Sequence, residues 1–408
     1  MNILFIHIAF PSQFTPLSTE INRSKKAKAY TLCLDSYRKA NQFDYDNLYS
    51  FDPDGDISKA EYYYSGQAEI SSKISIGLMW QIKKIIEKLD INLIVAHHTG
   101  GSPHFLFDEI NIPIITYIEF PSYRHHGWDT KYPPQDAQRY VDKNMEMLSM
   151  YQIMKSNYVI VPSKYSKKML PKIFHNKIYA HIEGFDSKKL KIKDSPIPFE
   201  KEKDTTYIGY TGRVLSSEKG FEQFMKISQE LIKRTPKKIK FIVVGGSTGV
   251  SYGYEKQNIE PQNFTNFKDY LIKRDNPTLN NYIFIEYLDY PAFSSFIHNV
   301  DFFLYPLQYG SGCWGLMEIF LRNKVIVASN RCYIPEIIHH GETGFLCDYD
   351  NVEQWISTIL NLIEEPNTLK KIQTNIERVS PEYYIENVLD DYLKMFRDVI
   401  EKSKRDPT

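Results

Sequence analysis

The stretch "GYTGRVLSSEKGFEQFM" (residues 209–225) joins a strand pattern to a helix pattern. An apolar run ends at Gly212, a polar loop carries Arg213 and Lys219, and apolar residues at helical spacing begin at Phe221. Glycine lets the backbone turn closely where the strand ends. Two explanations compete for the arginine and the lysine in this loop: solvated surface charge, or a pair of cations directed at a phosphate.

Strand-like and helix-like segments alternate along both halves of the chain. In the first half, short apolar runs lie at 3–8, 29–34, 92–97, 113–118 and 158–162, with helical patterns at 75–89 and 137–155. The second half repeats the scheme with the strands "TYIGYTG", "KKIKFIVVGG", "NYIFIEYL", "VDFFLYP" and "NKVIVAS". Apolar runs separated by helices indicate parallel sheets that are covered on both faces.

This alternation predicts an α/β fold of two Rossmann-like domains that face each other across a cleft. The length of 408 residues also suits two domains better than one core. We expect a first domain at 1–185, a charged, proline-containing linker at 186–205, a second domain at 206–378, and a C-terminal helix within 379–408 that crosses back to the first domain.

The composition narrows the class of protein. With 50 basic and 50 acidic residues the formal net charge is zero, so we expect no nucleic-acid partner. The four cysteines show no CxxC spacing, which predicts reduced thiols in a cytoplasmic protein and neither a disulfide framework nor a zinc site. The start "MNILFIHIAF" suits a buried strand better than a signal peptide, and no apolar stretch reaches membrane-spanning length. Any membrane contact is therefore expected to be peripheral.

Arg213 and Lys219 lie where ligands of parallel sheets bind, outside the carboxyl end of a strand. The start of the following helix adds partial positive charge. A diphosphate gathers negative charge as its bond to a sugar breaks, and preplaced cations stabilise that charge most in the transition state. The alternative is that both side chains are solvent-exposed, as most Arg and Lys are.

A second constellation lies at 301–348. A strand runs into the loop of Gly310, Ser311 and Gly312, whose small residues expose backbone N–H groups to an anion. The short helix "CWGLMEIFL" that follows carries Glu318 among apolar residues. A carboxylate in such a place needs a hydrogen-bonding partner, which a ribose diol or Arg322, four positions on, would provide.

These motifs carry a resemblance to a known family. "TGR" with its following Lys-Gly, the loop leading to "LMEIF", and "IPEIIHHGETGFLCD" resemble the C-terminal domain of retaining glycosyltransferases of family 4 (group 1). "ILFIHIAFPSQF", "IVAHHTGGSPHFL", "IEFPSY" and "VPSKYSKKMLPKIFHNKIYAHIEGFD" resemble the N-terminal domain of a bacterial branch. The resemblance implies a GT-B fold, with an acceptor-side first domain and a nucleotide-sugar-binding second domain.

The resemblance also implies the reaction. A sugar moves from a nucleotide-diphosphate sugar, with UDP or GDP expected, to a glycan, lipid-linked or small-molecule acceptor with retention of configuration. No metal and no cofactor beyond this co-substrate is implied. The setting implied is bacterial surface polysaccharide synthesis, in the cytoplasm or at the inner face of the membrane.

Carried over by position, Arg213 and Lys219 would hold the diphosphate and Glu318 the ribose hydroxyls. The remaining donor-side residues would be Gly310, Ser311, Gly312 and Gly315, the base-receiving loop at Tyr287 and Leu288, and Gly245 in the glycine pair after "FIVV". The family's usual first glutamate, eight positions before Glu318, is replaced by Gly310, which leaves the donor sugar open. Asn323 replaces a usual glycine, and Asn tolerates the left-handed turn expected there.

In the N-terminal domain, "AHHTGGSPH" follows a strand. His97 or His98 resembles the family position that contacts the sugar, and the alternative is a histidine bonded to local backbone. The spacing of His97, His98 and His104 suits no common metal site. Glu119 is expected either to line the acceptor side or to cap a loop. The aromatic and basic run "PSYRHHGWDTKYPP" (121–134), which includes Tyr123, is expected to be either an acceptor platform, because sugars stack on aromatic faces, or a plain surface loop.

Three other functions are alternatives to a glycosyltransferase. A nicotinamide-dependent oxidoreductase is disfavoured because no GxGxxG follows "FIHIAF" or "FIVVGG". A nucleotide-sugar epimerase would have the same fold with different chemistry. A non-catalytic sugar-nucleotide binder would explain the missing first glutamate.

Overall fold

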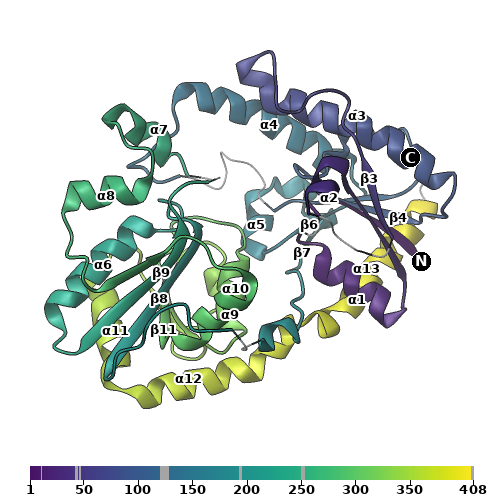
Figure 1. Cartoon of the computed structure of the whole chain (residues 1–408). Coiled ribbons are helices and arrows are strands. Elements are labelled where there is room, and N and C mark those ends of the chain that lie inside the picture. Colours follow the sequence, from purple (N-terminus) through teal and green to yellow (C-terminus); the bar gives the residue numbers. More distant parts are fainter. Residues whose placement is uncertain are drawn as a thin grey trace. The chain divides into compact units, whose positions relative to one another are not determined.

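The computed structural model of the chain describes residues 1–10, 12–41, 45, 47–119, 128–192, 195–249 and 253–405. These divide into two compact units (Figure 1). Unit 1 holds the described residues within 1–126, 136–186 and 382–408, and unit 2 holds those within 127–135 and 187–381. None of the helices in these ranges is long and apolar enough to cross a membrane.

Unit 1 is built on a seven-stranded parallel sheet with the order β3-β2-β1-β4-β5-β6-β7. Its strands are β1 (Asn2–Ile6), β2 (Lys28–Leu34), β3 (Leu48–Phe51), β4 (Leu93–His97), β5 (Ile114–Tyr117), β6 (Tyr158–Val161) and β7 (Ile178–Ala180). Its helices are α1 (Thr15–Ser24), α2 (Asp35–Asn41), η1 (Tyr63–Ser65), α3 (Gly66–Ile86), η2 (Pro103–Phe105), α4 (Asp136–Lys155), α5 (Lys164–Met169), η3 (Lys172–Lys177) and α13 (Ile385–Arg405).

Both faces of this sheet are buried because alternate residues of each strand serve opposite layers. Ile3 and Phe5 of β1 pack with α1 and α13, whereas Leu4 and Ile6 pack with α3. α1 and α13 lie side by side on their face of the sheet (Figure 1). The covered parallel sheet predicted for the first half is therefore confirmed.

The last helix, α13, is a strongly amphipathic element of unit 1. Its buried side chains, from Ile385 through Leu389 and Phe396 to Val399, recur at helical spacing and join the β1–β4 core. A bridge from Phe185 to Tyr384 fixes its start. The C-terminal residues thus complete the core of a unit whose strands come from the beginning of the chain.

Unit 2 is built on a six-stranded parallel sheet with the order β10-β9-β8-β11-β12-β13. Its strands are β8 (Thr205–Val214), β9 (Lys238–Gly246), β10 (Tyr282–Ile285), β11 (Phe302–Tyr305), β12 (Val325–Ser329) and β13 (Phe345–Cys347). Its helices are η4 (Lys189–Lys191), α6 (Phe221–Arg234), α7 (Glu255–Ile259), η5 (Glu260–Gln262), α8 (Phe267–Asp275), α9 (Tyr290–Asn299), α10 (Trp314–Phe320), η6 (Ile334–Glu336), α11 (Val352–Glu364) and α12 (Pro366–Val379), and η7 (Ser380–Tyr383) spans the boundary to unit 1.

Residues 128–135 also belong to unit 2, although the chain reaches them between β5 and α4. We call them the strap. By sequence pattern these residues are predicted to belong to the first domain, 1–185.

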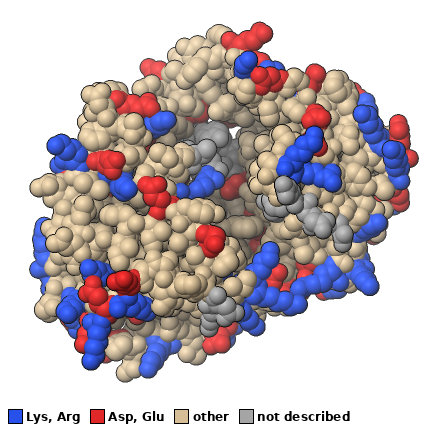
Figure 2. Space-filling view, in the orientation of Figure 1, with Lys and Arg blue, Asp and Glu red and all other residues tan. Residues whose placement is uncertain are grey.

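Local details follow from residue type. Asn323 adopts the expected left-handed conformation at φ 59°, so the predicted tolerance is confirmed. Over the visible face of both units, positive and negative side chains are interspersed, as the zero net charge suggests (Figure 2).

Candidate functional site

In open parallel sheets, ligands bind outside the carboxyl ends of the strands where the strand order reverses. In unit 2 this point lies between β8 and β11, because β9 and β10 follow on one side of β8 and β12 and β13 on the other side of β11. In unit 1 the corresponding point lies between β1 and β4. Most of the predicted site residues follow one of these four strands.

At the switch point of unit 2, the loops after β8 and β11 are packed against each other. Gly220 has φ 71°, and a Cβ atom built on it would lie 1.5 Å from the carbonyl oxygen of Pro306. The amide of Gln308 donates to the Glu218 carbonyl at 2.9 Å. Only glycine permits this approach, so the Lys-Gly pair of the opening motif has a definite structural reason.

Lys219 lies directly before this contact and is half-buried. A Cβ atom on Gly212 would lie 3.5 Å from Lys219 Cγ, so the lysine stem runs along the end of β8. Burial opposes ionisation of the Cys313 thiol, but the charge of Lys219, a hydrogen bond with Tyr305 and the amides of nearby α10 together lower its pKa. The positive charge of Lys219 is therefore felt at Cys313, at the start of α10.

Arg213 is exposed and is the next-to-last residue of β8, so its predicted place in the loop after the strand is wrong. Its backbone passes close to β9, where a Cβ atom on Gly246 would lie 3.3 Å from the Arg213 carbonyl oxygen. A Cβ on the preceding Gly245 would lie 2.5 Å from the carbonyl of Gly212. Gly245 is therefore required by the packing of two strand ends, which explains this glycine without a ligand.

The loop after β11 leads into α10. Ser311 is fully buried, whereas Gly312 and Gly315 are half-buried. A Cβ on Gly310 would make only ordinary contacts, the nearest at 3.4 Å to Leu307, and one on Gly315 would meet only the Cys313 sulfur at 3.7 Å. Packing alone therefore does not demand glycine at positions 310 and 315.

Glu318 on α10 forms an ion pair with Arg322, and the Tyr290 hydroxyl lies 3.3 Å from both of its carboxylate oxygens. The Arg322 side chain is fully buried and the Glu318 side chain is 12% exposed. The pairing with Arg322 considered from the sequence is therefore present. The carboxylate keeps a fixed direction because two groups hold it.

The loop between β10 and α9 holds the two residues expected near the base. Tyr287 is 81% exposed and Leu288 is half-buried. The loop lies at the carboxyl edge of the sheet, two strands from β8.

At the switch point of unit 1, His7 follows β1 and His97 ends β4. Their ring centroids are 4.9 Å apart. The Gly100 amide donates to His97 Nδ1 at 2.8 Å, and the Ala9 amide donates to His7 Nδ1 at 3.0 Å. In the neutral rings the proton is consequently on Nε2.

Burial lowers the pKa of both histidines to about 3, with the neighbouring His97 adding to the shift of His7. Both rings are therefore neutral near pH 7. His97 Nε2 is buried without a hydrogen-bond partner among the described residues and lies 3.7 Å from Glu119 Oε2. The sequence left open whether a histidine here bonds to local backbone. His97 does so through Nδ1, whereas its Nε2 lies next to the Glu119 carboxylate.

The remaining expected residues of unit 1 differ in position. His98 is buried next to His97, with ring centroids 5.1 Å apart. Glu119 is half-buried, and Gln13 donates to its Oε2 at 2.9 Å. Tyr123 lies outside the described residues.

Three residues that lie near these sites were not predicted from the sequence. His7 was hidden because the expected strand 3–8 included it, whereas β1 ends at Ile6. Gln13 stands in the quoted "FPSQF" but its contact with Glu119 is long-range. Cys313 follows the Gly-Ser-Gly loop, where its position before a helix was the available signal.

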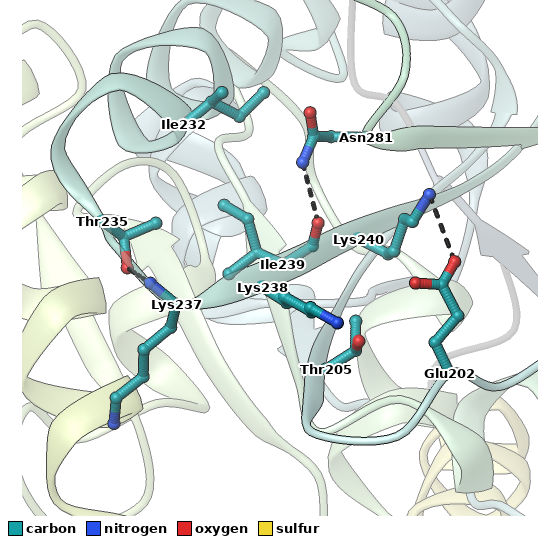
Figure 3. Close-up of a pocket in the computed structure, with 9 residues that line it drawn as sticks. All are labelled: Glu202, Thr205, Ile232, Thr235, Lys237, Lys238, Ile239, Lys240 and Asn281. Carbon is teal, nitrogen blue, oxygen red and sulfur yellow. Dashed lines mark hydrogen bonds and ion pairs between the residues drawn. The ribbon is translucent and has the colours of Figure 1, made fainter.

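A separate cavity of about 140 Å³ opens at the amino ends of β8 and β9 (Figure 3). It is lined by Glu202, Thr205, Ile232, Thr235, Lys237, Lys238, Ile239, Lys240 and Asn281. Lys237 Nζ donates to the Ile363 carbonyl at 2.9 Å and Lys240 Nζ to the Asn280 carbonyl at 3.0 Å. This cavity is at the opposite end of the strands from Lys219, so it is not part of the switch-point site.

Across the ranges described above, no group of three or more His, Cys, Asp or Glu side chains is arranged to hold a metal ion.

Solved structures share this fold over nearly the whole chain. Sucrose-phosphate synthase from Thermosynechococcus elongatus has a TM-score of 0.71 at 14% identity, covering 98% of this chain and 100% of that one. HepE from Anabaena in complex with UDP has a TM-score of 0.64 at 14% identity, with 98% and 100% covered. A glycosyltransferase from Rickettsia africae has a TM-score of 0.68 at 13% identity, with 98% of each chain covered. No curated protein sequence matches the chain.

Two parallel α/β units and the likeness to these solved structures define the GT-B fold. Residues 31–190 match the model of the glycosyl transferase family 4 group, and residues 192–379 match that of the glycosyl transferases group 1. The chain belongs to this family of glycosyltransferases, and the predicted fold and family are confirmed.

Proposed function

We propose that the protein is a retaining glycosyltransferase that uses a nucleotide-diphosphate sugar without a metal ion. The observation that carries this proposal is the position of Lys219 at the switch point of unit 2, directly before the close approach of Gly220 to Pro306, which leads into the loop that holds Gly310, Ser311 and Gly312. A cation and a small-residue loop at this place suit a diphosphate.

In the proposed reaction, the bond between the anomeric carbon and the diphosphate oxygen breaks as a bond to an acceptor hydroxyl forms on the same face. The acceptor proton passes to the leaving phosphate. Arg213 and Lys219 stabilise the charge on the diphosphate, which is largest in the transition state. No protein nucleophile is required.

Glu318 is proposed to accept hydrogen bonds from the ribose hydroxyls. Arg322 and Tyr290 hold its carboxylate in one direction, so little side-chain freedom is lost on binding. Tyr287 and Leu288 are proposed to receive the base, since their loop follows β10 at the same edge of the sheet.

His97 is the better supported of the two sugar-contact candidates in unit 1. Its neutral ring presents a buried Nε2–H donor next to Glu119, so a hydroxyl group could bind between donor and carboxylate. We assign Glu119 to the acceptor side for this reason. The proposal excludes catalysis by a charged imidazolium at neutral pH.

The donor proposed first is a UDP-sugar. Structures of the similar protein HepE contain UDP, UDP with glucose, or UDP-glucose, and GDP-sugars are the alternative. The acceptor is proposed to be a glycan, a lipid-linked glycan or a small molecule in bacterial surface polysaccharide synthesis, by resemblance to the family.

We further propose that the protein works in the cytoplasm at the inner face of the membrane. Between Glu146 and Glu183 the chain carries lysines but no acidic residue. Met154 on α4 and Ile173 on η3 lie within this basic segment, and their side chains are exposed. Lys177 links them, since its Nζ donates to the Met154 carbonyl at 2.8 Å and it lies in the same short helix as Ile173. Basic residues beside exposed apolar side chains favour an anionic lipid surface.

Vesicle sedimentation tests this location. Vesicles with anionic lipid should retain the protein and neutral vesicles should not, and Ile173→Ser with Met154→Ser should weaken retention. Equal retention on both vesicle types, or none on either, would refute the membrane proposal and leave the transfer reaction unaffected.

The function is tested by calorimetric binding of UDP, GDP, ADP and dTDP, followed by turnover assays with sugars of the base that binds. Transfer to an acceptor, or slow donor hydrolysis with retained configuration, is expected. Release of epimerised sugar would favour the epimerase, and binding without turnover would favour the non-catalytic binder. Binding of NAD and of none of these nucleotides would favour a nicotinamide-dependent oxidoreductase.

A further inference from the structure

The strap, residues 128–135, is anchored in unit 2 by a buried tyrosine. Tyr132 is 4% exposed, and its ring meets Phe267 of α8 edge-on at 5.0 Å between centroids. Its hydroxyl donates to Glu222 Oε2 at 3.1 Å and accepts from Arg274 at 3.2 Å. Ordinary surface loops have exposed side chains, so the burial of Tyr132 and the two bonds of its hydroxyl set the strap apart from them.

Glu222 is the residue on which the strap converges. Lys131 Nζ lies 3.2 Å from its Oε1, and Arg274 of α8 lies 2.9 Å from the same atom. Glu222 stands in the first turn of α6, three residues after Lys219. The strap thus contacts the helix start that directly follows the proposed diphosphate loop.

The other end of the strap is also buried. Asp129 is 5% exposed, and burial raises the pKa of its carboxyl group, which Lys131 and Arg331 oppose. Arg331 in turn donates to the side-chain oxygen of Gln308. The backbone amide of Gln308 donates to the Glu218 carbonyl. The ion-pair partner of Arg331 is Asp350, whose Oδ2 lies 3.0 Å from Arg331 Nη2.

Backbone contacts continue the anchoring along the strap. The Gln135 amide donates to Gln257 Oε1 at 3.1 Å, and Asn258 Nδ2 donates to the Pro133 carbonyl at 3.1 Å. Contacts with α6, α7 and α8 therefore fix the segment from Lys131 to Gln135.

We propose that the strap positions the donor site of unit 2, with Tyr132 and Lys131 fixing the start of α6. This inference rests on the proposed function, because it assumes that a nucleotide diphosphate binds at Lys219. It makes Tyr132, encoded in the first half of the chain, a positioning residue for a site built by the second half.

Nucleotide binding and docking of the strap on unit 2 are thermodynamically linked, so the inference can be tested by measuring either one. If the docked strap strengthens nucleotide binding by some factor, bound nucleotide must strengthen strap docking by the same factor. A residue that only stabilises the fold would not show this reciprocity at its own segment.

The first experiment measures UDP binding by calorimetry on the full chain. Tyr132→Ala should weaken UDP binding at least tenfold, whereas Tyr132→Phe, which keeps the ring in place, should weaken it less. Tyr140→Ala is the matched control, since Tyr140 is 52% exposed on α4 and outside the strap, and it should change binding less than twofold.

The second experiment uses the wild-type chain, so it stands even if Tyr132→Ala fails to fold. Saturating UDP should slow tryptic cleavage after Lys131 by about the same factor as the affinity loss in Tyr132→Ala, or at least tenfold. Cleavage after Lys168, an exposed residue of α5 in unit 1, should not change.

The outcomes separate the two proposals. If the wild type binds none of UDP, GDP, ADP or dTDP, the proposed function and the strap inference both fail. If it binds one of these nucleotides but Tyr132→Ala binds that nucleotide equally well, or the nucleotide leaves cleavage after Lys131 unchanged, only the strap inference is overturned.

Discussion

Replacing Gly220 with alanine should uncouple the two loops of the candidate donor site. The new Cβ would lie 1.5 Å from the Pro306 carbonyl oxygen, so the loop after β11 must move away. Alanine at φ 71° costs about 1 kcal/mol, displacement of packed backbone about 1–3 kcal/mol, and loss of the Gln308–Glu218 bond about 1 kcal/mol. We therefore expect a loss of about 3–5 kcal/mol in the free energy of unfolding.

Gly341 provides the matched control for this substitution. It lies in the same unit with φ 76°, but a Cβ atom there would meet nothing within 4 Å. Gly341→Ala should therefore cost only the conformational part, about 1 kcal/mol. The difference between the two variants isolates the close approach from the backbone strain.

Urea unfolding at pH 7 measures both free energies, and UDP calorimetry on the folded fraction measures the site. Gly220→Ala should be less stable than Gly341→Ala by about 2–4 kcal/mol and should bind UDP more weakly. Equal stability of the two variants would refute the reasoning, because it would mean that the loops after β8 and β11 are not held together at Gly220.

Lys219→Ala should lower turnover by about 10²-fold or more, the effect of removing one preorganised charge stabiliser, whereas Lys226→Ala on the exposed side of α6 should leave it unchanged; equal rates would count against the leaving-group role. The pKa values of His7 and His97 are lowered from about 6.5 to about 3, so the unfolded state takes up their protons first and stability falls as the pH drops below 6.5. The loss should reach about 2 kcal/mol per histidine at pH 5 in urea titrations, and His97→Asn should remove its share. Wild-type protein should bind UDP more tightly than 2′-deoxy-UDP, and Glu318→Gln should reduce this preference; an unchanged preference would remove the ribose contact.

The βα unit at 209–225 was predictable because strand, turn and helix signals are local. The pattern placed Lys219 beyond a strand end, and the need for glycine at 220 agrees with that position. Asn323 was predictable for the same reason, since its left-handed turn depends on one residue type.

Other features depend on contacts that the sequence does not encode locally. Tyr132 docks on Glu222, which is ninety positions away, so its loop could be described only as aromatic and basic. The strands β3, β7 and β13 have three or four residues and are only partly buried, so they lack the continuous buried apolar run that makes the four-residue strands β5 and β6 recognisable. For Glu318, the ribose and Arg322 explanations fit the same helical spacing, and the contact with Arg322 became visible only in three dimensions.

A crystal structure of the protein with bound UDP tests the central claim most directly. The account predicts the β-phosphate within hydrogen-bonding distance of Lys219 Nζ, next to the loop of Gly310 to Gly312, with the ribose at Glu318. Phosphates bound elsewhere, such as among Lys237 and Lys238 at the amino ends of the strands, would contradict it.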